Sequence, residues 1–154
     1  MDKPAAREVD GAVDQDALVE LLNQDLATEF RSIVQYVQHF ATVKGPEYQG
    51  AILILKPHLA QELTHATVLA EQIEFLGGIP TTMVPSVPSE PDSQRGFELD
   101  LELEEHQLAG YRERVEQAEA AGLPDVAEAL RPLLEQTQDH VRDLRSVLSV
   151  DSHA

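Results

Sequence analysis

Apolar residues recur along this chain at spacings of three and four, the period of helices that bury one face. Strand-like alternation is almost absent. The stretches that show the helical pattern cover approximately residues 14–44, 48–76, 93–121 and 124–150. They are separated by residues that end helices, namely Gly45-Pro46, Gly77-Gly78 and Gly122-Leu123-Pro124. The pattern predicts an all-α protein of four long helices.

Local signals refine the first two helices and the chain ends. Asp14 or Asp16 is placed to cap the start of the first helix. Pro57 lies inside the second stretch, so we expect it to kink or split that helix. The layout that we expect is a flexible lead-in, a four-helix domain and a short tail, at residues 1–13, 14–150 and 151–154.

The lengths of the connections predict the topology. Short loops join the first helix to the second and the third to the fourth, which makes each pair an antiparallel hairpin. The connection over residues 77–96 is long and contains four prolines. At about 3.3 Å per residue it reaches about 60 Å, whereas a 30-residue helix is about 45 Å long. The connection is therefore long enough to run the length of the bundle, which would make the second and third helices parallel. A flexible linker between two separate hairpins is the alternative.

Three glutamates and two histidines interrupt the apolar stripes near the middle of the helices. Glu29 and Glu104 take stripe positions in the first and third helices, Glu62 and His65 in the second, and His140 in the fourth. A charge on a core stripe costs several kcal/mol unless it is paired, protonated or bound to a cation. No basic residue falls on these stripes, so a bound metal is the simplest compensating charge. The alternative is that Glu29 and Glu104 lie on the helix surface.

The same spacings occur in both halves of the chain. Histidine follows glutamate by 36 residues from Glu29 to His65, and again from Glu104 to His140. A tyrosine follows each of these two glutamates by seven residues. The two hairpins therefore form an internal pseudo-repeat. The second helix also carries a Glu-x-x-His, whose two side chains project from one helix face. Together these features point to a metal centre between the helices.

Composition excludes several classes of protein. The 154 residues fit one domain, and the absence of cysteine excludes a thiolate metal site, a disulfide scaffold and a Cys nucleophile. Eleven basic against 28 acidic residues give a net charge of −17, which repels phosphate backbones and argues against a nucleic-acid partner. The N-terminus lacks a signal pattern and the longest apolar run, residues 51–55, is too short to span a bilayer. We therefore expect a cytoplasmic protein with no membrane partner.

Over about residues 18–148 the chain resembles the ferritin-like di-iron carboxylate proteins, most closely the bacterioferritins. The resemblance is carried by LNQDLATEFRSIVQYVQHF, LAQELTHATVLAEQIEFLGGIP and DLELEEHQLAGYRERVEQAEAAG, which are similar to the family's first three helices. It implies a ferritin-like four-helix bundle with one long crossover, in which two helices each supply a Glu and two a Glu-x-x-His. By that resemblance Tyr36 is the tyrosine beside the centre. The implied metal ligands are Glu29, Glu62, His65, Glu104 and His140.

The resemblance also implies an activity. Fe(II) would be oxidised by oxygen or peroxide for iron storage or detoxification, with Glu29, Glu62, Glu104 and Tyr36 as the catalytic residues. The expected cofactor is iron, as two ions, although carboxylate and imidazole ligands also suit Mn(II) or Zn(II). Further copies of the chain are expected partners, from a dimer up to a cage. The alternatives are a rubrerythrin-like peroxide-reducing protein and a catalytically silent metal-binding bundle.

The chain departs from the family pattern at three places. Thr137 stands where the second Glu-x-x-His needs its glutamate, so five ligands remain and the second metal position is expected to be weak, water-filled or lost. Gln136 shares the helix face of His140, but a neutral amide is a poor substitute. Leu63 stands where bacterioferritins have the haem-binding methionine, so haem bound in that way is not expected. The tail after His140 leaves little room for the small fifth helix that supports a 24-subunit cage.

The other histidines lie off the ligand pattern. His39, His58 and His106 are expected at the surface or around the ligands. His58 sits one turn before Glu62, where it could assist metal entry.

Overall fold

A computed structural model describes residues 13–151, so residues 1–12 of the expected lead-in and residues 152–154 of the expected tail lie outside the described residues. Within the described part there is no strand. A short 3-10 helix, η1 (Pro46–Tyr48), precedes the second helix. The four long helices are α1 (Gln15–Thr42), α2 (Gln49–Phe75), α3 (Ser93–Ala120) and α4 (Pro124–Asp151). The predicted all-α architecture is confirmed.

Side-chain caps and glycines set the helix ends. The Asp14 carboxylate accepts the backbone N–H three residues on at 2.8 Å, and Asp92 does the same at the start of α3 at 2.8 Å. Gly77 and Gly122 follow α2 and α3 with φ angles of 84° and 76°. Residues with a side chain seldom adopt this left-handed conformation, so glycine suits these helix ends.

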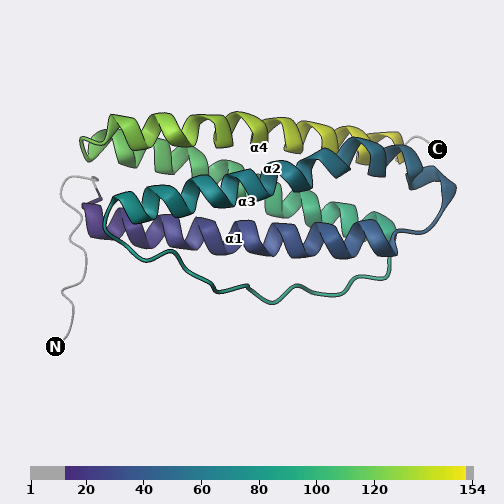
Figure 1. Ribbon diagram of the computed structural model, residues 1–154. Coiled ribbons are helices and arrows are strands. Elements are labelled where there is room, and N and C mark those ends of the chain that lie inside the picture. The colour runs from purple at the N-terminus through teal and green to yellow at the C-terminus, as the bar shows by residue number, and fades with distance from the viewer. Residues whose placement is uncertain (1–12, 152–154) are drawn as a thin grey trace.

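Two prolines lie inside helices without ending them. Pro57 lies within α2 and Pro132 within α4, and both residues are exposed. Proline removes one i→i−4 hydrogen bond, which would join residue 57 to the carbonyl of Leu53. Leu53 is exposed as well, so water can satisfy that carbonyl. α2 is therefore continuous across Pro57, and of the two expectations for this proline, a kink or a split, the split is wrong (Figure 1).

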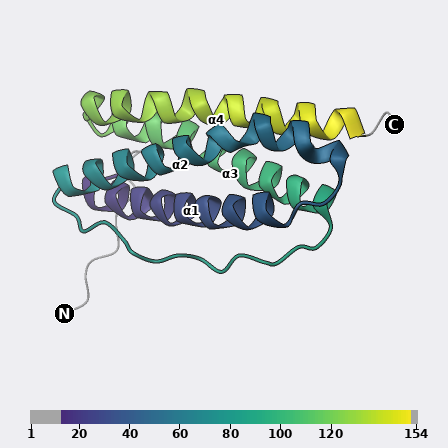
Figure 2. The same cartoon turned by 45° about the vertical axis from the view of Figure 1, so that its right-hand side comes forward.

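The helices form two antiparallel hairpins that pack on each other. α1 runs opposite to α2 and α3 opposite to α4, whereas α2 and α3 run in the same direction (Figures 1 and 2). α1 packs against α2 and α3, and α4 packs against α2 and α3. The segment 76–92 passes along the bundle beside α1 (Figure 1). The predicted crossover is thus confirmed, and two separate hairpins on a flexible linker are excluded.

Side chains of α1 hold the crossover in place. The Asn23 side chain donates to the carbonyl of Ile79 at 3.1 Å and accepts the N–H of Thr81 at 2.8 Å. Further along, Gln38 donates to the Ser89 hydroxyl at 3.2 Å.

The apolar core is divided in two. One cluster lies toward one end of the bundle and contains Leu18, Leu22, Leu26, Ala66, Leu69, Ile73, Tyr111, Val115, Ala118, Val126, Ala127, Leu130 and Leu133. The other, toward the opposite end, contains Ala51, Leu55, Phe97, Leu144 and Val147. Between their contacts with the two clusters, all four long helices carry buried polar residues, although α1 reaches the second cluster only through the partly buried Phe40. This polar layer crosses the middle of the bundle.

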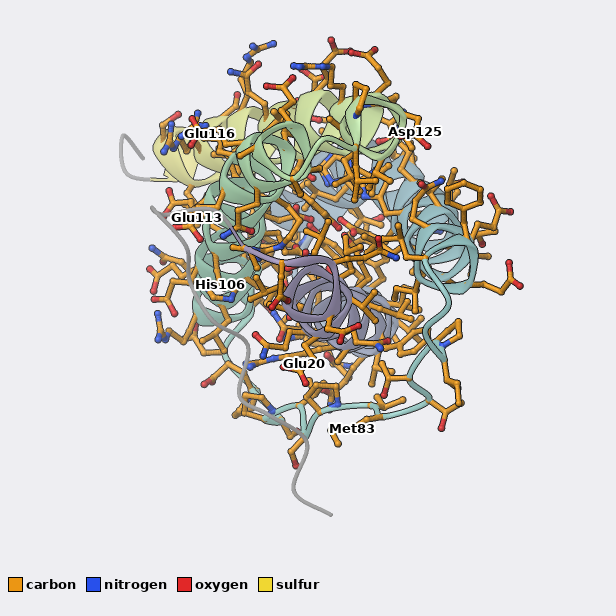
Figure 3. The ribbon with its side chains drawn as sticks, turned by 90° about the vertical axis from the view of Figure 1, so that its left-hand side faces the viewer. Glu20, Met83, His106, Glu113, Glu116 and Asp125 are labelled. Atoms are coloured by element: carbon orange, nitrogen blue, oxygen red, sulfur yellow. The ribbon has the colours of Figure 1, made fainter. Side chains whose placement is uncertain are left out.

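Many charged side chains lie on the outside of the bundle. Figure 3 looks along the helices and shows Glu20, Glu113, Glu116 and Asp125 at the periphery. His106 also lies there, as the sequence predicts. Among the described residues no helix combines the length and apolarity that crossing a bilayer requires.

Candidate metal centre

The five residues expected as metal ligands meet in the polar layer. All are buried, and they come from all four helices. The alternative that Glu29 and Glu104 are surface acids is wrong, because their exposed fractions are 0% and 1%. The stripes are indeed interrupted by carboxylates at the centre of the core.

Short distances connect the acids and imidazoles of this layer. His65 Nδ1 lies 3.5 Å from Glu29 Oε1 and 3.6 Å from Glu62 Oε2. His140 Nδ1 lies 2.9 Å from Glu62 Oε1 and 3.2 Å from Glu104 Oε1. Glu62 therefore contacts the histidines of both hairpins, one through each carboxylate oxygen.

Two glutamines orient the imidazoles. His65 Nε2 donates to Gln136 Oε1 at 2.8 Å, and His140 Nε2 donates to Gln61 Oε1 at 2.5 Å. An amide oxygen only accepts, so each Nε2 carries a proton. With a metal at the centre, each Nδ1 would then be free to direct a lone pair to it. The sequence pattern indicated Gln136 only as a poor substitute ligand and indicated no role for Gln61. The signal was present, since Gln61 and Gln136 each precede the histidine by four residues.

Each tyrosine of the pseudo-repeat bonds to the glutamate of the other hairpin. The Tyr36 hydroxyl donates to Glu104 Oε1 at 2.8 Å, and the Tyr111 hydroxyl donates to Glu29 Oε1. Burial and the neighbouring glutamates raise the pKa of both tyrosines well above the usual value. Both hydroxyls are therefore protonated donors near neutral pH.

The glutamates differ in how readily they ionise. Burial, together with the charges of Glu29 and Glu104, raises the pKa of Glu62 well above its usual value. Burial also acts to raise the pKa of Glu104, but hydrogen bonds with His140, Glu62 and Tyr36 outweigh it and lower that pKa. Without a cation, Glu62 thus holds its proton to higher pH than an ordinary glutamate, whereas Glu104 ionises more readily.

Several ligand atoms of the layer are buried and have no hydrogen-bond partner within residues 13–151. They are Oε2 of Glu29, Glu62 and Glu104, and Nδ1 of His58 and His65. Buried polar atoms are nearly always partnered, so this concentration calls for an explanation. Carboxylate oxygens and imidazole nitrogens are ligands for Fe(II), Mn(II) and Zn(II). The residues present therefore fit a divalent metal centre.

The potential ligands fall into two groups. In each group every residue offers one ligand atom, and these three atoms all lie within 4.8 Å of one another. The groups are Glu29 with Glu62 and His65, and His58 with Glu104 and His140. The second group contains a histidine that the sequence did not place among the ligands.

Thr137 adds no ligand atom to the second group. It is buried, and its hydroxyl donates to the carbonyl of Leu133 in its own helix at 2.7 Å. The missing carboxylate is therefore replaced only by a neutral hydroxyl, whose proton is used within its own helix.

His58 and His39 are not surface residues, although the sequence allowed that reading. His58 is 3% exposed, and burial lowers its pKa, assisted by the charge of His140. His39 is buried too, with Nδ1 2.8 Å from Asp100 Oδ1. The pseudo-repeat gives that pair a counterpart. Asp25 precedes Asp100 by 75 residues, Arg114 follows His39 by 75, and Arg114 Nε lies 2.7 Å from Asp25 Oδ2.

The four-helix bundle and its buried carboxylate–histidine layer define a class of metal-binding helical proteins. The chain matches the Ferritin family, described as a ferritin-like domain, over residues 19–152, and it belongs to that family. It is 26% identical over 125 residues to a bacterioferritin of Desulfovibrio desulfuricans, covering 80% of this chain and 70% of the relative. The resemblance to bacterioferritins is confirmed.

Solved structures agree with this assignment. A ferritin-like, di-iron-carboxylate protein of Bacillus anthracis is 31% identical with a TM-score of 0.83, covering 88% of this chain and 97% of that one. The D. desulfuricans bacterioferritin, whose structure describes a di-iron site, is 24% identical with a TM-score of 0.79, covering 88% and 80%. A dodecameric thioferritin of Bacteroides fragilis has the same fold at 21% identity, with a TM-score of 0.77 and coverages of 91% and 89%.

Proposed function

We propose that this protein is a ferroxidase that takes up Fe(II) and oxidises it with oxygen or peroxide, for iron storage or detoxification. The observation that carries the proposal is the convergence of buried, unpartnered carboxylate and imidazole atoms from all four helices. The di-iron-carboxylate relatives support iron as the metal. Two Fe(II) ions supply the two electrons that, with two protons, convert oxygen to hydrogen peroxide.

Each catalytic residue has a role in this proposal. Glu29 and His65 would hold one iron ion, and Glu104 and His140 would hold the other. Glu62 would be shared between the two ions, which its contacts to both histidines support. Tyr36 positions Glu104 through its hydrogen bond.

Stopped-flow Fe(II) oxidation tests the proposal. We expect the wild type to oxidise Fe(II) faster than a protein-free control, and Thr137→Glu to raise the rate about tenfold, equivalent to about 1.4 kcal/mol. The matched control is Thr137→Gln, which has the same size but no charge and should not accelerate the reaction. A wild type equal to the protein-free control, with no gain from glutamate, would overturn the proposal. Thr137 would then favour a catalytically silent bundle.

The native mass separates storage from other roles. We propose a cytoplasmic homo-oligomer, which the dodecameric relative supports. Size exclusion with light scattering should give a mass above the 17.0 kDa of one chain. A cage of hundreds of kDa supports storage, whereas a dimer supports a non-storage di-metal oxidoreductase such as a peroxide reductase.

A further inference from the structure

We propose that His58 is a metal ligand, which makes the second half of the centre a position with two histidines and one carboxylate: His58, Glu104 and His140. The inference rests on the proposed function, in that it requires a metal at the centre. It adds a ligand that lies outside both the pseudo-repeat and the Glu-x-x-His pattern.

The His58 ring lies directly against the centre. It is 3% exposed and stacks on the His140 ring, with centroids 3.9 Å apart and planes inclined by 17°. Ligand atoms of His58, Glu104 and His140 all lie within 4.8 Å of one another. One ion can therefore be reached by all three side chains.

The hydrogen bonds of His58 leave one nitrogen for a metal. Nε2 lies 2.9 Å from Asp143 Oδ2, whereas Nδ1 is buried and has no partner in the described part of the chain. A carboxylate that accepts the Nε2 proton places the lone pair on Nδ1, the usual arrangement behind a metal-bound imidazole. His65 and His140 are held in the same way by Gln136 and Gln61. All three imidazoles thus keep Nδ1 for the centre.

The pseudo-repeat explains why one hairpin has the additional imidazole. Leu133 stands 75 residues after His58, and Thr137 stands 75 residues after Glu62. The second hairpin therefore lacks both the histidine and the carboxylate. The His58 imidazole from the first hairpin supplies a third donor to Glu104 and His140, where Thr137 supplies none.

The two positions consequently differ in the number of imidazoles. Besides the shared Glu62, the first has one carboxylate and one histidine, Glu29 and His65, and the second has one carboxylate and two histidines. Two histidines with one carboxylate is a set that binds Fe(II) in other proteins.

Anaerobic titration of the metal-free full-length protein with Co(II), followed by calorimetry, tests the assignment. We expect two equivalents in the wild type. His58→Leu, which installs the residue of the repeat-related position, should keep one equivalent at its original affinity and weaken the second at least about tenfold. The matched control is His39→Gln, a buried histidine outside both ligand groups, which should still bind two.

A second variant keeps the test decisive if His58→Leu does not fold. Asp143→Ala leaves the imidazole in place, and because the Asp143 side chain is 42% exposed, water can replace it. It should weaken the second equivalent about 10–100-fold. The assignment is overturned if His58→Leu, or Asp143→Ala where His58→Leu does not fold, binds two Co(II) ions with wild-type affinity.

Other outcomes separate this inference from the proposed function. A wild type that binds two Co(II) ions, loses the second in His58→Leu and yet does not oxidise Fe(II) would support the ligand assignment and overturn the ferroxidase. A wild type that binds no metal would overturn both.

Discussion

At the scale of single residues, the charges of the centre depend on one another. Glu62 has a raised pKa because it is buried beside Glu29 and Glu104, whereas hydrogen bonds lower the pKa of Glu104. A bound cation would remove the need for a proton on Glu62. The metal-free and metal-bound proteins should therefore respond differently to pH.

Glu62→Gln tests this dependence in chelated, metal-free protein. A carboxyl whose pKa is raised by folding stabilises the fold fully below its unfolded pKa, near 4.3, and that contribution is lost as pH rises through the folded pKa. Glutamine mimics the protonated form at every pH. Near pH 7.5 we expect the variant to melt about 2–4 °C higher than the wild type, which corresponds to about 1 kcal/mol of unfolding free energy. Near pH 4 the two proteins should have the same melting temperature.

Exposed Glu71 on the same helix provides the control, and Glu71→Gln should leave the melting temperature within about 1 °C of wild type. Added metal should reverse the order, because a glutamine amide is the poorer ligand. A metal-free Glu62→Gln protein that melts below the wild type at all pH values would contradict the prediction.

At the scale of helices, α2 and α4 share an internal proline that precedes their buried polar residues. Pro57 and Pro132 stand 75 residues apart, and each is followed by a buried residue, His58 or Leu133. The sequence analysis predicted an effect of Pro57 on the second helix but none of Pro132 on the fourth. Periodicity alone cannot show that a helix continues past proline, because continuation depends on water reaching the freed carbonyl.

Pro57→Ala restores the N–H that can bond to the Leu53 carbonyl. We expect the variant to gain about 1–3 kcal/mol of unfolding free energy, measured by denaturant titration. Any local change in helix geometry also moves His58, so the second Co(II) equivalent should weaken. Pro132→Ala is the matched control, since it should stabilise similarly and retain two equivalents. If Pro57→Ala leaves the free energy of unfolding unchanged, Pro57 does not destabilise α2 and the prediction is wrong.

At the scale of the whole molecule, neither hairpin contains a complete centre. The tyrosine–glutamate and histidine–glutamine bonds all cross from one hairpin to the other. The crossover makes this possible by returning the chain along α1, so that α2 and α3 run in the same direction (Figure 1). Asn23 fixes the start of that path with two hydrogen bonds.

Asn23→Ala removes both bonds and should loosen the crossover without disturbing the centre. Two lost hydrogen bonds are worth about 1–2 kcal/mol, which corresponds to about 5–30-fold faster cleavage within residues 79–92 in limited proteolysis. Co(II) stoichiometry should stay at two. Glu20→Ala, an exposed change one turn earlier in α1, should leave the cleavage rate unaltered. Equal cleavage of Asn23→Ala and wild type would mean that Asn23 does not hold the segment.

The sequence by itself determined the four helices, the crossover length and the positions of Glu29, Glu62, His65, Glu104 and His140 on core stripes. These follow from periodicity and from the cost of burying charge, which are properties of each helix alone. Only the tertiary structure decided that Asp143 bonds to His58, that glutamines orient the other imidazoles and that each tyrosine bonds to the opposite glutamate. A helical period assigns a residue to a face, but rotation and register between packed helices decide which neighbour it meets, and one residue of shift turns a face by about 100°.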